Sequence, residues 1–160
     1  VQYHSEKQIA LVQFDTKLRM TPFGAAVKML RMHKATEVLA NSSGLDKNGN
    51  GLGALATLDG VGLVVELWNL QPVGKRSQQT NVSVANLPKN LQGGELRIRR
   101  YLIDSKHSNC LTKPDSVGGL QMVEQRTETA GTEVRLSVTM EPMSLCLWTI
   151  EKEPRPANVP

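Results

Sequence analysis

The spacing of apolar positions divides the chain into one helical segment near its start and a longer region of short strands. After Asn41, apolar runs of strand length are separated by clusters of Gly, Asn, Asp and Pro. Strands and turns that alternate every ~8–12 residues are typical of an antiparallel sandwich or barrel. The expected strands are Leu52–Asp59, Leu63–Asn69, Thr80–Asn86, Glu95–Asp104, Leu120–Arg126, Thr132–Met140 and Met143–Ile150. The pattern therefore predicts a mainly β fold class, an antiparallel two-sheet β-sandwich with one N-terminal α-helix.

The helical segment begins at Thr21, whose hydroxyl can cap a helix, and Pro22 suits the first helical turn. Good helix formers continue to Lys34, and a short apolar run of strand length, Gln8–Phe14, precedes the helix. The expected apolar face of the helix consists of Ala26, Val27, Leu30 and His33. We expect residues 1–35 to form this strand and helix, residues 36–152 the sandwich, and residues 153–160 an extended tail.

Two of the expected strands carry further information in their alternation. From Val134 to Met140 every second residue is apolar, which predicts one buried and one exposed face. In the segment from Arg97 to Ile103 the alternation slips by one position between Arg99 and Arg100, which predicts a β-bulge in that strand. The turn Asp59-Gly60-Val61-Gly62 is suited to a hairpin.

Composition narrows the class of protein. A chain of 160 residues with 39% hydrophobic residues can bury the core of one globular domain. Only six aromatic residues and a net charge of +4, spread along the chain, give little support to nucleic-acid binding. Apolar stretches stay far short of the ~18 residues of a membrane span. We therefore expect a soluble domain that binds neither nucleic acid nor membrane.

The cysteines and the first residue give two further expectations. Cys110 and Cys146 belong to no CxxC motif, so a disulfide between them and two buried thiols both remain open. The chain begins with Val1 rather than Met, which indicates a piece of a longer or processed polypeptide.

Six stretches of the sequence, taken in order, resemble a known group of enzymes. The stretches are Thr21–Phe23, Val27–Leu30, Gly53–Gly60, Val64–Leu70, Arg97–Asn109 and Met143–Trp148. In this order they resemble the C-terminal region of clan A glycoside hydrolases, most closely the β-xylosidases and α-L-iduronidases of family 39. A weaker likeness extends to the α-L-arabinofuranosidases of family 51. The segment Arg97–Asn109, RIRRYLIDSKHSN, is the most specific of the six.

The resemblance implies a place in a larger enzyme. Family members carry two catalytic glutamates on a (β/α)8 barrel, whose last helix leads into a β-sandwich. Thr21–Lys34 would correspond to that helix. The 160 residues leave no room for a barrel of ~250 residues, so no catalytic residue is carried over. In the family, the first sandwich strand can come from residues before the barrel. We therefore expect an uncovered sheet edge and some tendency to self-associate.

Three groups of polar residues are candidates for chemistry: the acidic residues, the His107-Ser108-Asn109 segment and the Asp46–Gly51 loop. The acidic residues on strands and loops are expected to be solvated rather than catalytic; they include Glu66, Glu95, Glu124, Glu128 and Glu133. His107-Ser108-Asn109 is expected to form a polar turn that hydrogen-bonds the backbone. The loop Asp46–Gly51 matches half of an EF-hand, and Asp46, Asn48 and Asn50 are candidate Ca²⁺ ligands, although Thr57 replaces the final glutamate. No other cofactor is expected.

Carbohydrate contact and glycosylation supply the remaining candidate residues. Trp68, on the polar phase of its strand, is the best candidate platform for a sugar ring, with Tyr101 and Arg99 as further candidates. Trp148 is expected to be buried. Asn41 and Asn81 lie in Asn-x-Ser sequences that accept N-glycans in secreted proteins, and a secreted or extracytoplasmic location is favoured.

Three functional hypotheses follow. The first is a non-catalytic C-terminal sandwich of a xylosidase-like glycoside hydrolase, with a structural or docking role beside a catalytic barrel and no activity alone. The second is an independent carbohydrate-binding module for plant-type polysaccharides. The third is one chain of a split glycosidase, whose helix face would contact the barrel. None of these patterns specifies the sugar.

Overall fold

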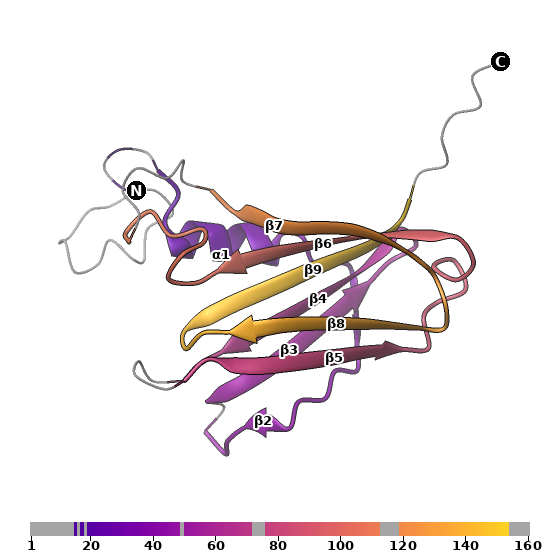
Figure 1. Ribbon diagram of the computed structural model, residues 1–160, viewed down its shortest axis with the longest axis horizontal. Helices are drawn as coiled ribbons and strands as arrows, with labels where there is room; N and C mark the ends of the chain where they lie inside the picture. Colours follow the sequence, from indigo (N-terminus) through magenta and orange to yellow (C-terminus); the bar gives the residue numbers. More distant parts are fainter. Residues whose placement is uncertain are drawn as a thin grey trace.

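The chain forms a β-sandwich with a helix on its outer face. The computed structural model describes residues 15, 17, 19–48, 50–71, 76–112 and 119–153, so the predicted strand Gln8–Phe14 and residues 154–160 of the predicted tail lie outside the described residues. The described elements are α1 (Pro22–Leu30), β1 (Thr36–Val38), β2 (Gly44–Leu45), β3 (Gly51–Leu58), β4 (Gly62–Asn69), β5 (Gln78–Ala85), β6 (Glu95–Ile103), β7 (Gln121–Thr129), β8 (Glu133–Met140) and β9 (Ser144–Lys152). The predicted fold class is confirmed (Figure 1).

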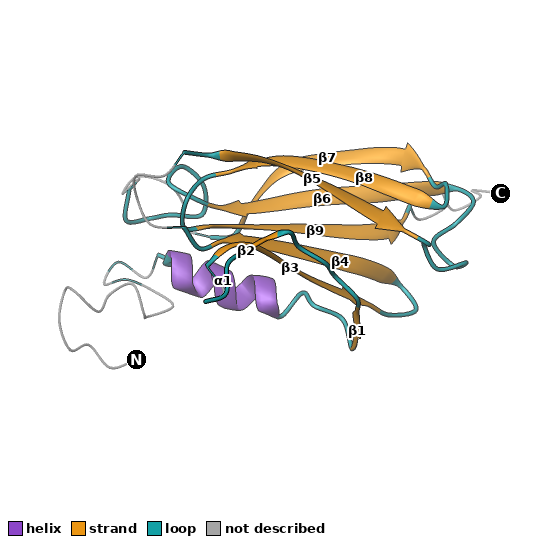
Figure 2. Ribbon diagram, turned by 90° about the horizontal axis from the view of Figure 1, so that it is seen from below, coloured by secondary structure: helices purple, strands orange, loops and turns teal. Residues whose placement is uncertain are grey.

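All strand pairs within the described chain are antiparallel, and they form two sheets of unequal width. The main sheet has the order β1-β3-β4-β9-β6-β7, with β2 also paired to β3, whereas the small sheet contains β5 and β8 alone. The small sheet lies on one face of the main sheet and α1 on the opposite face (Figure 2). Two strands cannot cover the whole inner face of the wider sheet, and this mismatch determines where the molecule stays open.

The core between the sheets comes from alternate residues of facing strands. In β8, Val134, Leu136, Val138 and Met140 are buried and the residues between them are exposed, as the alternation predicts. They face buried side chains of the main sheet: Leu63, Val65, Leu67, Leu96, Ile98, Cys146, Trp148 and Ile150. The prediction that Trp148 is buried is therefore confirmed.

The predicted hairpin turn is present between β3 and β4. The Asp59 Oδ1 accepts hydrogen bonds from the backbone N–H groups of Val61 and Gly62, each at 2.8 Å. These N–H groups, with a smaller contribution from Lys34, hold the pKa of Asp59 below its ordinary value. The carboxylate thus stays charged and fixes the register in which the two long strands pair.

The helix starts where the sequence predicts but buries a different face. Thr21 caps it by accepting the Gly24 N–H at 3.2 Å. The buried residues of α1 are Gly24, Ala25 and Met29, whereas Leu30 of the predicted apolar face is 59% exposed. Ala25 and Met29 pack on Val64, Ile103 and Leu147. The small Ala side chain lets the helix approach the outer face of the sheet, and the flexible Met side chain fits the remaining space.

A buried polar contact ends the helix at Leu30, four residues before the predicted Lys34. The His33 Nε2 lies 2.6 Å from the Glu66 carboxylate, and its Nδ1 lies 3.0 Å from the Thr57 hydroxyl. Thr57 also accepts the Lys34 backbone N–H at 2.9 Å. These bonds draw the chain away from the helix axis and satisfy polar groups that would otherwise be buried without partners. Glu66 therefore serves the helix–sheet contact rather than facing solvent.

The prediction of a bulge within the strand Arg97–Ile103 is wrong about the strand, because the extra residue lies in β7. β6 pairs with β9 without interruption, whereas its register with β7 shifts between Arg100 and Tyr101. Arg100 is opposite Glu124 and Tyr101 is opposite Met122, which leaves Val123 as the extra residue. Arg100 can stay on the inward phase of β6 because its guanidinium finds polar partners there, so β6 itself needs no bulge.

The two cysteines are free and buried, which decides between the two alternatives left open by the sequence. Burial raises the pKa of both thiols, more strongly for Cys146 in the main core. No helix among the described residues is long and apolar enough to cross a membrane.

Adjacent residues on α1 give a matched test of this packing. Met29 is fully buried and Leu30 is 59% exposed. We expect Met29→Ala to lower the free energy of unfolding by about 2–5 kcal/mol, because it leaves a cavity between α1 and the sheet. Leu30→Ala should change it by less than about 0.5 kcal/mol. Urea denaturation of both variants measures this, and equal losses would contradict the observed helix orientation.

Candidate functional site

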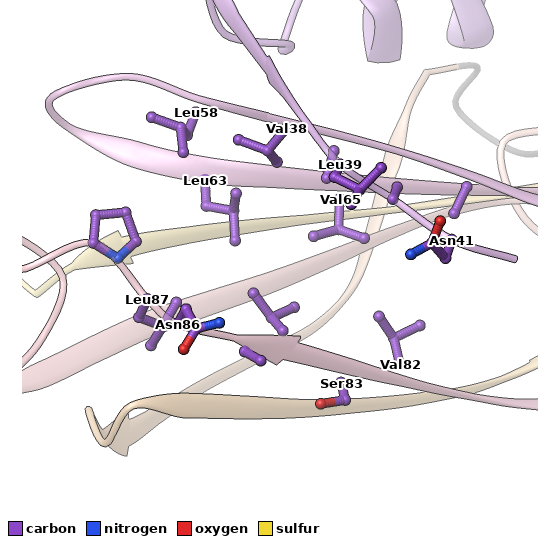
Figure 3. Close-up of a pocket in the computed structure, with 16 residues that line it drawn as sticks. Val38, Leu39, Asn41, Leu58, Leu63, Val65, Val82, Ser83, Asn86 and Leu87 are labelled. Atoms are coloured by element: carbon purple, nitrogen blue, oxygen red, sulfur yellow. The ribbon is translucent and has the colours of Figure 1, made fainter.

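A groove opens between the two sheets beside β5. It has a volume of about 550 Å³ and continues the core outward past the edge of the small sheet. Figure 3 shows Leu63 and Val65 on one side of it and Val82 on the other. Its remaining apolar lining comes mainly from Val38, Ala54, Ala56, Leu58, Val84 and Leu87. The groove is therefore a part of the core that no described strand covers.

The edge of β5 along this groove is open. Within the described chain β5 pairs with β8 alone. The carbonyls of Arg135 and Ser137 bond arginine side chains on the side of β8 away from β5, so by alternation the even-numbered residues of β8 and their even-numbered partners in β5 face each other. The backbone groups of Asn81 and Ser83 then face the groove. The strand Gln78–Ala85 has no charge and no proline, the residues that normally protect an edge.

The opposite edge of the small sheet is closed by arginines. Arg100 donates from Nη1 to the Ser137 carbonyl, and Arg126 donates from Nη2 to the Arg135 carbonyl, both at 3.0 Å. Glu124 holds both guanidinium groups, at 3.0 Å from Arg100 and 3.1 Å from Arg126. Charge-assisted bonds of this kind are stronger than neutral ones. The small sheet thus has one protected edge and one edge that is free to pair.

The outer side of α1 presents a second apolar surface. Phe23 is 41% exposed and Leu30 is 59% exposed, and Val27 lies between them at helical spacing. This stripe includes two residues of the face that the sequence predicts to be apolar. The sheet does not use it, so α1 is apolar on two sides.

The structure places the three predicted carbohydrate residues on two strands of the main sheet, Trp68 on β4 and Arg99 and Tyr101 on β6. Trp68 is half-buried, and its indole lies over Gly53, where the missing side chain leaves room for the ring. Tyr101 packs in the cluster beneath α1. Arg99 bonds Gln125 at 2.9 Å and approaches Glu151 at 3.7 Å. The three share the outer face of the main sheet but have separate surroundings.

The acidic residues considered as catalytic candidates each have a structural partner. Glu66 bonds His33, Glu95 accepts from Thr129, and Glu133 pairs with Arg135 at 3.0 Å. Glu124 and Glu128 share Arg126, at 3.1 Å each. Each of these carboxylates thus takes part in a contact within the fold.

The predicted polar turn at His107-Ser108-Asn109 is confirmed. Ser108 is buried and donates its hydroxyl proton to the Leu102 carbonyl, and its oxygen accepts the Gln121 N–H at 2.9 Å. The Asn109 amide donates to the Asp104 carbonyl at 3.2 Å. His107 contacts the Asp104 carboxylate, at 2.9 Å. The motif therefore ties the loop after β6 to the start of β7.

In the Asp46 loop, the carboxylate of the predicted metal ligand bonds the loop itself. It accepts the backbone N–H groups of Asn48 and Asn50 and the Asn50 side-chain amide, which hold the pKa of Asp46 below its ordinary value. Among the described residues no group of three His, Cys, Asp or Glu could hold a metal ion. The calcium site stays a prediction. The hydrogen bonds of the loop already engage the Asp46 carboxylate.

Both predicted glycosylation residues are exposed. Asn41 lies at the rim of the groove, as Figure 3 shows, and Asn81 lies on the outer face of β5. The Asn81 side chain accepts a hydrogen bond from Ser137 at 3.0 Å. Attachment of a glycan at either residue stays a prediction.

Two functional features were missed by sequence reasoning. The first is the pair Arg100 and Arg126 that closes the β8 edge, and the second is the His33–Glu66 contact that fixes α1. The sequence did offer one signal for the first feature. Arg100 is a charged residue on the inward phase of its strand, and a buried guanidinium needs hydrogen-bond partners.

Comparison with known proteins gives a likeness of fold. No protein-family model matches the sequence, and no curated protein matches it. Among solved structures, the GH39 enzyme from Xanthomonas axonopodis pv. citri superposes with a TM-score of 0.70 at 14% identity, over 88% of this chain and 32% of its own. A monomeric β-xylosidase from Caulobacter crescentus CB15 gives 0.68 at 11% identity, over 88% and 32%.

A third structure extends the match along this chain. The bacterial orthologue of human α-L-iduronidase gives a TM-score of 0.67 at 16% identity, over 99% of this chain and 31% of its own. The chain thus spans about a third of the length of these solved proteins. Its fold is that of a part of glycoside hydrolases of the xylosidase and iduronidase type.

Proposed function

We propose that this chain is the non-catalytic β-sandwich of a glycoside hydrolase of the family 39 type, with a structural role beside a catalytic barrel. The fold likeness to about a third of three such enzymes supports the parent class. The ordered stretches of sequence, from Thr21–Phe23 to Met143–Trp148, support the same placement.

The observation that carries the proposal is the unfinished small sheet. An uncharged open edge at β5, beside a groove of about 550 Å³ with mostly apolar walls, is suited to one further strand with alternating apolar residues. A strand from another part of the parent chain would complete the sandwich here. Where that strand is absent, the same edge would let copies of this chain associate.

The exposed stripe of α1 supplies the second contact. Phe23 and Leu30 lie on the side of the helix that faces away from the sandwich. We propose that this side packs against the barrel, so that one helix buries one face in each domain. Such a helix joins two domains rigidly, which suits a positioning role.

Enzyme assays test the non-catalytic role. The purified chain should release no aryl alcohol from aryl β-xylosides, α-L-iduronides or α-L-arabinofuranosides, because each of the acidic residues considered above is bonded to a structural partner. Hydrolysis that persists through purification, and is lost in a Glu124→Gln variant, would contradict the proposal. The matched variant Glu128→Gln, on the same arginine, controls for loss of the ion pairs.

A carbohydrate-binding module is the second candidate, because the Trp68 indole lies flat over Gly53 on a sheet face. The apolar face of a saccharide can pack on an aromatic ring, and this indole is half-buried rather than fully covered. Under the accessory-domain proposal, titration with xylan or arabinoxylan should leave the fluorescence of Trp68 unchanged. Tight binding that Trp68→Ala abolishes, and that Leu70→Ala at the end of the same segment preserves, would establish the binding module instead.

A further inference from the structure

A second hollow lies at the end of the sandwich from which α1 starts. It has a volume of about 420 Å³, within the range of small-ligand sites. Its apolar wall is formed by Ile103, Pro142 and Met143, together with Pro22 at the first turn of α1. Ser105, Asn109 and Glu141 are among its polar lining residues. The hollow therefore joins the helix, the loop after β6 and the turn between β8 and β9.

Hydrogen bonds within the rim hold the polar groups in place. One Glu141 carboxylate oxygen accepts the Ser105 N–H at 3.2 Å, and the Thr112 hydroxyl donates to the Ser105 carbonyl at 2.8 Å. The lining contains two carboxylates: that of Asp104 is engaged by the backbone N–H groups of Lys106 and His107 and by the His107 ring, whereas that of Glu141 accepts the Ser105 N–H alone among the described hydrogen bonds. Such a rim offers acceptors to hydroxyl groups and repels an anionic ligand.

Backbone strain is concentrated around the same hollow. Three non-glycine residues of the described chain have a left-handed φ, and two of them, Ser108 at 54° and Met143 at 56°, lie in the two loops that form the rim. Met143 is also 59% exposed. Ser108 is buried and bonded within its loop, whereas the strain at exposed Met143 has no such partner in the described hydrogen bonds of its side chain; glycine would adopt this φ without strain, and strained residues cluster at functional sites.

The position of the hollow relative to α1 indicates what it would face. Helices of a (β/α)8 barrel begin at the face where the strands end, and active sites lie at that face. Pro22 at the start of α1 lines the hollow. If α1 is the last barrel helix, the hollow opens on the catalytic side of the enzyme.

We propose that this hollow is a saccharide subsite that takes one uncharged pyranose unit of the parent enzyme's substrate, an inference that rests on the proposed function. Sugar hydroxyls would donate to the carboxylate oxygens of Glu141, and the apolar face of the ring would pack on Pro142 and Met143. The Glu141 carboxylate disfavours a uronic acid at this position. The subsite binds and orients, and it takes no part in bond cleavage.

Chemical-shift mapping tests the subsite on the chain as it is. Methyl β-D-xylopyranoside, titrated into ¹⁵N-labelled chain, should shift amide signals of residues 104–112 and 141–143 saturably, with a dissociation constant in the millimolar range. Methyl β-D-glucuronide should shift them at least about fivefold less at equal concentration, the factor expected for loss of one hydrogen bond.

Two variants separate binding from a merely structural role. Met143→Gly relieves the left-handed strain, so it should keep or raise the melting temperature while weakening xyloside binding at least about fivefold. Glu141→Gln should reduce the discrimination against the glucuronide. Glu133→Gln, an exposed carboxylate on β8 outside the hollow, is the matched control and should change neither result.

The outcomes also separate this inference from the proposed function. Absence of saturable shifts in the hollow, or equal shifts with both glycosides, would overturn the subsite and leave the accessory role standing. Shifts centred on Trp68 would overturn it in favour of a binding module. Hydrolysis of the xyloside by the chain itself would refute the accessory role, whatever the location of the shifts.

Discussion

The architecture depends on how a two-stranded sheet is held over a wider one. Two isolated strands are marginally stable in water, so β5 and β8 persist because Val134, Leu136, Val138 and Met140 bury against the main sheet. Arg100 and Arg126 complete the attachment by bonding carbonyl groups on the far edge of β8. Because the β8 edge is occupied by arginine side chains, a further strand could pair with the small sheet only at β5, beside the groove.

The outer face of the main sheet is organised by a different interaction. α1 is fixed at its end by the His33–Glu66 contact at 2.6 Å and along its length by Ala25 and Met29. Because these residues use one side of the helix, Phe23 and Leu30 stay exposed on the other. The molecule thus has an open strand edge on one layer and an apolar helix stripe on another, and the proposed function assigns a partner surface to each.

Local patterns predicted the strands well, since burial on one face imposes a period of two, as in β8. They were wrong where a second layer covers the other face. The alternation of Glu66 and Trp68 with Leu63, Val65 and Leu67 predicts that both face solvent. In the structure Glu66 is buried, because His33, just after α1, bonds its carboxylate. The buried face of α1 and the position of the bulge depend on partners distant in sequence. The open groove follows from sheet width, which strand periodicity does not encode.

Hydrogen exchange of the four backbone amides from Asn81 to Val84 tests the unfinished sheet most directly. The open edge predicts that Asn81 and Ser83 exchange close to the rate of an unstructured peptide, while Val82 and Val84, bonded to β8, exchange at least about 100-fold more slowly. Equal protection of all four amides would show that the β5 edge is already covered, and would contradict the account.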